Sequence, residues 1–108
     1  MTKPVNQRDA LRDFMPKLVQ LTDDFVFNDV WERPELSKRD RSLVVISALI
    51  ALGKERQMGN YLKRALDNGL TVEEIKEAIT HLAIYSGWPT AFTAATIFKE
   101  VLEERGLA

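Results

Sequence analysis

The residues best suited to chemistry surround one break in an apolar helical stretch, "HLAIYSGWPTAFTAA", which begins at His81. His81 is the single histidine of the chain, and an unperturbed imidazole titrates near neutral pH, which suits proton transfer. Tyr85 and Trp88 flank Gly87 and would form an aromatic wall with a polar handle. The structural alternatives are a packed or capping His81, and packing or a subunit interface for the two aromatic residues. With no partner visible in the sequence, the structural alternatives are favoured.

Three arginines before the longest apolar run supply cations for a carboxylated ligand. Arg33, Arg39 and Arg41 lie in a connector and in the first turn of the helix expected after it. A guanidinium fork suits a carboxylate better than the point charge of a lysine does. The alternative is a solvated helix start, which we favour for Arg39 and weigh equally with ligand binding for Arg41.

The residues that several other kinds of chemistry require are absent from the sequence. The chain contains no cysteine, which excludes thiolate nucleophiles, zinc–thiolate sites and dithiol redox chemistry. No histidine pair or histidine–carboxylate set occurs at ligand spacing, and no Gly-rich phosphate loop is present. Glu73, Glu74 and Glu77 cluster at a helix start, where capping and the helix dipole favour acids. We therefore expect neither a metal nor another cofactor.

Apolar residues recur at helical spacing along nearly the whole chain, and no stretch shows the sustained alternation of a strand. We predict an all-α fold, a compact bundle of about six helices. "WERPEL" is expected to be an extended connector, because the residue before a proline is disfavoured in helical geometry. The helix starts and stops are expected at Pro16, Lys38, Gly53, Gly69, Thr71 with Glu74 as a capping box, Gly87, Pro89 and Gly106.

Length and charge bound the rest of the interpretation. At 108 residues and 45% hydrophobic, the chain fits one domain spanning residues 1–108. Fifteen basic and sixteen acidic residues are interleaved and leave a net charge of −1, so no nucleic-acid partner is expected. The apolar run "LVVISALIAL" is far shorter than the about 20 residues of a membrane span, and no signal-peptide core is visible, so we expect a cytoplasmic protein. A helix formed by this run would be apolar on nearly all sides, and a domain this small can hardly bury it. A homo-oligomer is therefore expected.

Four segments in register resemble the carboxymuconolactone decarboxylase family, in the branch that includes γ-carboxymuconolactone decarboxylase. They are Trp31 with the following Arg-Pro, "RDRSLV" from Arg39, "NGLTVEEI" from Asn68 and "YSGWPTA" from Tyr85, within residues 27–102. The resemblance implies an alkylhydroperoxidase D-like fold in a homo-oligomer, typically a hexamer built as a ring of dimers. It also implies a carboxy-lyase that decarboxylates a small carboxylated lactone in aromatic catabolism without a cofactor.

The redox branch of this family has a different pattern of functional residues. A Glu is followed twelve residues later by a Cys-x-x-Cys pair, and a His lies four residues after the second Cys. By register, these places hold Ser42, Lys54, Gln57 and Tyr61 here. Without a thiolate, dithiol peroxidase activity is excluded. The decarboxylase branch ordinarily keeps the His, so Tyr61 departs from that pattern as well.

The implied decarboxylation needs a cation for the carboxylate, donors for the developing oxyanion and a proton source. A tyrosine hydroxyl can donate a hydrogen bond, but with a reference pKa of about 10 it is a poor general base near neutral pH. Core or interface packing is the structural alternative for Tyr61. The catalytic candidates are Arg41, Tyr61 and His81, and the substrate-binding candidates are Arg33, Tyr85 and Trp88. The alternative function is a non-catalytic or small-molecule-binding homo-oligomer that has lost the catalytic His of the family.

Overall fold

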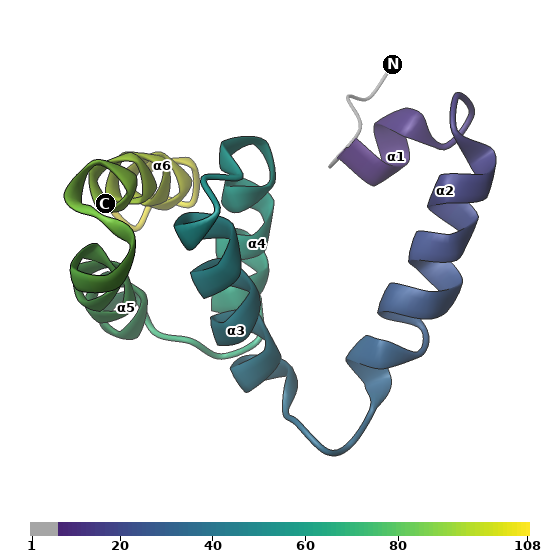
Figure 1. Cartoon of the computed structure of the whole chain (residues 1–108), viewed down its shortest axis with the longest axis horizontal. Helices are drawn as coiled ribbons and strands as arrows, with labels where there is room; N and C mark the ends of the chain where they lie inside the picture. The colour runs from purple at the N-terminus through teal and green to yellow at the C-terminus, as the bar shows by residue number, and fades with distance from the viewer. Residues whose placement is uncertain (1–6) are drawn as a thin grey trace. The chain divides into compact units, whose positions relative to one another are not determined.

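The computed structural model describes residues 7–108 and contains six α-helices and no strand within that range, which confirms the all-α prediction (Figure 1). The chain forms two compact units, Met1–Lys38 and Arg39–Ala108. The single domain over residues 1–108 stays a prediction. None of the described helices is both long and apolar enough to cross a membrane.

The N-terminal unit combines short α-helices with less regular turns. Pro16 begins a helix as expected, but the helix becomes a π-helix after one and a half turns instead of continuing as α-helix. At this transition the Thr22 hydroxyl donates a hydrogen bond to the Leu18 carbonyl at 2.8 Å. The elements of the N-terminal unit are α1 (Gln7–Leu11), α2 (Pro16–Leu21), the π-helix η1 (Thr22–Phe27) and the 3-10 helix η2 (Val30–Glu32).

Within residues 7–38, few side chains are buried and several apolar ones are exposed. The buried apolar residues of this range are Val19 and Trp31, and the Phe27 and Trp31 rings stack with their centroids 6.1 Å apart. An exposed row of apolar side chains runs from the turn before α2 through η1 at spacings of four and three residues. The row consists of Phe14, Leu18, Leu21 and Phe25.

The connector between the units is extended over a shorter stretch than predicted. Arg33, directly before Pro34, has φ −67° and ψ 137°, as expected for a residue before proline. Trp31 and Glu32 instead belong to η2, so the prediction that all of "WERPEL" is extended is wrong. The restriction that a proline imposes acts on its immediate predecessor and leaves earlier residues free to form a turn.

The C-terminal unit consists of four longer helices that begin and end close to the predicted residues. They are α3 (Lys38–Ala51), α4 (Glu55–Asp67), α5 (Val72–Ser86) and α6 (Trp88–Glu104), and α6 packs against both α4 and α5 (Figure 1). The capping box at the start of α5 is confirmed: the Glu74 N–H donates to the Thr71 hydroxyl at 3.0 Å, and the Thr71 N–H donates to the Glu74 carboxylate at 2.9 Å.

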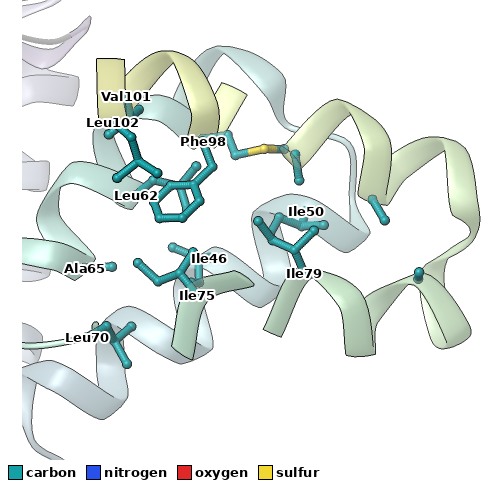
Figure 2. Close-up of a cluster of buried hydrophobic side chains, with 14 residues drawn as sticks. Ile46, Ile50, Leu62, Ala65, Leu70, Ile75, Ile79, Phe98, Val101 and Leu102 are labelled. Atoms are coloured by element: carbon teal, nitrogen blue, oxygen red, sulfur yellow. The ribbon is translucent and has the colours of Figure 1, made fainter. Parts of the chain in front are cut away.

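The core of the C-terminal unit draws on all four of its helices. Figure 2 shows the labelled core side chains pointing toward one another, with the Phe98 ring of α6 beside Leu62 of α4. One side of α3 remains exposed at Val44, so this apolar helix is only partly covered in the single chain. The core residues are Ile46, Ile50, Met58, Leu62, Ala65, Leu70, Ile75, Ile79, Ala83, Ala91, Ala94, Phe98, Val101 and Leu102.

A buried polar contact ties α3 to the end of α4. Ser42 is 1% exposed, and its hydroxyl accepts a hydrogen bond from the Asn68 side-chain amide at 2.9 Å. Buried polar groups are costly unless they are hydrogen-bonded, so this contact stabilises Ser42 within the apolar surroundings of α3.

The corner between α5 and α6 requires glycine. Gly87 has φ 102° and ψ 148°, a region that only glycine visits readily. We therefore expect Gly87→Ala to lower the free energy of unfolding by about 1–3 kcal/mol. Gly59, inside α4, is the matched control, because a Cβ there would meet Ile97 Cγ2 at an ordinary 3.8 Å.

Urea unfolding of both glycine variants, followed by circular dichroism, measures this difference. Gly59→Ala should keep or raise stability, by up to about 1 kcal/mol, because alanine is the better helix former. Equal losses in the two variants would contradict the assigned role of the corner.

Candidate functional site

A surface groove of about 470 Å³ lies between α3 and α5 and contains the most reactive combination of side chains. Its size falls in the range of small-molecule sites. From α3 it takes residues at spacings of four, which lie on one face of that helix. It is lined by Arg39, Leu43, Ser47, Leu70, Glu74, Glu77, Ala78, His81 and Leu82.

An ion pair joins the two helices that line this groove. An Arg39 Nη2–Glu74 Oε2 contact joins α3 to α5, and Arg39 Nη1 also lies 3.1 Å from the Asp40 carboxylate. The backbone N–H of Thr71 donates to the other Glu74 oxygen and, with the charge of Arg39, holds the pKa of Glu74 below its usual range. Glu74 is therefore charged at neutral pH and has two roles, as a helix cap and as the partner of Arg39.

His81 lies in the groove about two helical turns beyond Glu74 on α5. It is exposed, and its ring lies beside that of Tyr85, with centroids 5.2 Å apart and the planes at 59°. The structure thus brings together two of the predicted site residues. An exposed imidazole can exchange protons with solvent, as a repeated proton-transfer step requires.

Trp88 lies on a different surface from His81. With Phe92 and the small residues Ala83 and Ala91 it lines a separate groove of about 180 Å³ between α5 and α6. This groove is almost wholly apolar, so it suits packing against another surface or an apolar ligand better than acid–base chemistry.

A further groove between α5 and α6, of about 830 Å³, is larger but chemically poorer. Lys76 and Lys99 offer ammonium groups above a floor that includes Ile79 and Phe98. It contains no imidazole, and an ammonium group is in general a weaker acid than an imidazolium group, so it suits proton delivery less well. The groove between α3 and α5 is therefore the better candidate site despite its smaller volume.

Three other predicted residues lie away from the groove or in the other unit. Arg41 is partly buried on α3 and, two residues after Arg39, lies about 200° around the helix from it. Tyr61 packs against the core from α4, and the Arg64 guanidinium lies 5.5 Å from its ring centroid. Arg33 belongs to the N-terminal unit, where its Nε lies 3.6 Å from Glu35. Their roles stay predictions.

Arg39 is the groove residue that sequence reasoning set aside. Its spacing from Leu43 and Ser47 places all three on one helical face, and this signal was present in the sequence. The signal has no functional meaning until the facing helix is known to carry His81. In residues 7–108, no group of three or more His, Cys, Asp or Glu side chains is placed to hold a metal ion.

Comparison with known proteins identifies the family of this chain. The pattern of the carboxymuconolactone decarboxylase family matches residues 16–100. The chain belongs to the carboxymuconolactone decarboxylase family. The 4-carboxymuconolactone decarboxylase of Acinetobacter baylyi is 36% identical over 107 residues, which cover 98% of this chain and 80% of the relative.

A second relative has a differently named activity. The nitrosuccinic acid decarboxylase npaB of Metarhizium robertsii is 29% identical over 85 residues. The match covers 79% of this chain but only 59% of that relative. Both names describe decarboxylases, so decarboxylation is the activity that these two relatives share.

The places of the family's redox pattern are spread between surface and core in this structure. Lys54 precedes α4 and is exposed, whereas Gln57 and Tyr61 on α4 are partly buried. Ser42, at the place of the redox glutamate, is closed off from solvent by its surroundings and bonded to Asn68. As expected from the absence of cysteine, no thiol chemistry is available to this member of the carboxymuconolactone decarboxylase family.

Proposed function

We propose that the protein is a carboxy-lyase that removes CO₂ from a small carboxylated lactone in the groove between α3 and α5, with 4-carboxymuconolactone as the first candidate substrate. The observation that carries this proposal is the placement of a guanidinium, Arg39, and the single imidazole of the chain, His81, in one groove of metabolite size. The shared naming of the two relatives as decarboxylases supports the reaction type. The reaction uses no cofactor.

The two groups have separate tasks in this reaction. When the carbon–carboxylate bond breaks, its electron pair moves into the conjugated ring toward the lactone carbonyl. His81 in its protonated form then delivers a proton to the carbanionic carbon and is reprotonated from solvent. Arg39 anchors a carboxylate that the substrate retains, because pairing with the departing carboxylate would stabilise the ground state and slow the reaction.

The remaining predicted residues stay part of the proposal as groups to be tested in the same assay. Tyr85 beside His81 would bind substrate at the edge of the groove. For Arg41, Tyr61, Arg33 and Trp88, alanine variants distinguish a site role, which changes kcat or KM, from a packing role, which changes stability alone.

The protein is also proposed to be a cytoplasmic homo-oligomer, with six subunits as the expected number. The exposed row Phe14, Leu18, Leu21 and Phe25, and the exposed side of α3 at Val44, support association. Light scattering coupled to size-exclusion chromatography gives the subunit number.

The direct test is to incubate the pure oligomer with 4-carboxymuconolactone and to follow CO₂ and the enol-lactone. Turnover above background is expected, and its absence in a correctly assembled protein would remove this substrate. Tyr61→His then separates the alternatives. Activity gained only in that variant would indicate a non-catalytic oligomer that has lost its catalytic histidine, whereas an active wild type supports the enzyme proposed here.

A further inference from the structure

We propose that Glu74 is a built-in competitor for the substrate: its carboxylate occupies the position on Arg39 that the anchoring carboxylate of the substrate takes. This inference rests on the proposed function of the groove and assigns to Glu74 control over which ligands bind there. Glu74 and Arg39 line the same groove as His81 and are joined by an ion pair in the unliganded protein.

The arrangement of hydrogen bonds lets Glu74 release Arg39 without dismantling the start of α5. One carboxylate oxygen, Oε1, accepts the Thr71 N–H, and the other, Oε2, contacts Arg39. An incoming carboxylate can replace Oε2 on the guanidinium while Oε1 continues to cap the helix. Because both side chains are about two-fifths exposed, at 40% for Arg39 and 43% for Glu74, the exchange needs no opening of the core.

The charge of the groove makes this competition effective. Among the described residues that line it, Arg39 is the only permanently charged cation, and Glu74 and Glu77 supply two carboxylates. A ligand with a weakly held or missing anionic group cannot replace Glu74, whereas a second carboxylate correctly spaced from the reacting carbon can. The groove therefore selects small acids that carry an anionic group in addition to the carboxylate that leaves.

Protonation does not operate this exchange near neutral pH. The groups that face Glu74 are Thr71 and Glu77 on its own side and Arg39, with Asp40 behind it, from α3. Thr71 and Arg39 favour the charged carboxylate, so Glu74 releases Arg39 by protonation only at a pH below the ordinary carboxyl range. Near neutral pH, ligand concentration controls the exchange.

Binding of succinate, an unreactive dicarboxylate, tests the proposal without turnover. The signals of His81 report binding in proton NMR without assignment, because the chain has one histidine. Glu74→Gln keeps an oxygen for the Thr71 N–H but removes the competing charge. It should lower the Kd for succinate by about two- to fivefold, the range of an exposed ion pair. Glu73→Gln is the matched control on the same helical turn, because Glu73 does not line this groove.

Each outcome decides for or against the competitor role. Three results support the competitor role. The Kd for succinate is lower in Glu74→Gln than in Glu73→Gln, binding is lost in Arg39→Gln, and neutral succinamide gives no response. Equal effects of the two glutamate variants, or no binding of succinate to the wild type, overturn it. If a variant unfolds, ¹⁵N NMR of the wild type with increasing succinate replaces it. A shift of the Arg39 guanidinium signals is then expected as succinate takes the place of Glu74. If the decarboxylase assay fails while succinate still binds, the proposed reaction is contradicted but the competitor role of Glu74 is not.

Discussion

His81→Gln is expected to lower kcat for 4-carboxymuconolactone by about 10²- to 10⁴-fold, the usual contribution of a positioned proton-transfer group. Glutamine retains a hydrogen-bonding side chain of similar reach but cannot deliver a proton near neutral pH. Because His81 is exposed and outside the core cluster, the variant should keep its helical content and its unfolding temperature. The KM should change less than kcat, since Arg39 and the groove walls remain.

The division of the effect between kcat and KM separates proton transfer by His81 from a positional effect. Loss of the proton donor lowers kcat, whereas a displaced substrate would also change KM. Lys76→Gln on the same helix is the control, because Lys76 lines the groove on the other side of α5. A His81→Gln variant with more than a tenth of the wild-type kcat would remove His81 from the reaction.

Phe98→Ala should destabilise the protein by about 3–5 kcal/mol, the largest effect expected of a single core substitution here. The Phe98 side chain of α6 is 2% exposed and lies beside Leu62 in the core (Figure 2). Its removal leaves a cavity at the point where α6 packs against α4, and the helices cannot close over it without losing other contacts. Urea unfolding at fixed protein concentration measures the loss.

Phe92→Ala is the matched control for the core variant. Phe92 lies on the same helix but is 67% exposed, so its removal should change the stability of the single chain by no more than about 0.5 kcal/mol. A loss that increases with protein concentration would place Phe92 in a subunit interface. Losses of equal size for the two phenylalanines at all concentrations would contradict the assigned core.

The fold was predictable because its signals are local. The capping box of Thr71 and Glu74 and the glycine at position 87 each involve neighbours in sequence, and the structure confirms both. The π-helix of η1 was not predictable, since the apolar spacing along residues 18–26 is equally compatible with a continuous α-helix.

The candidate site was only partly predictable because its residues come from two helices. His81 and Tyr85 were named as separate candidates in one segment, and the structure places their rings side by side. Arg39 and Glu74 are far apart in sequence, and each has a sufficient local explanation, one as a solvated helix start and the other as a cap. Only the packing of α3 and α5 around a groove shows that the two side chains meet.

The buried Ser42–Asn68 bond also restricts how this chain could acquire the chemistry of the redox branch. Substituting Lys54, Gln57 and Tyr61 changes residues that have at least partial access to solvent. A glutamate at position 42 would instead place a carboxylate where the serine is 1% exposed and would break the bond to Asn68. That substitution should be tolerated only after a buried partner exists, so the order of the mutational steps matters. Peroxidase activity is thus separated from this sequence by an unstable intermediate as well as by missing thiols.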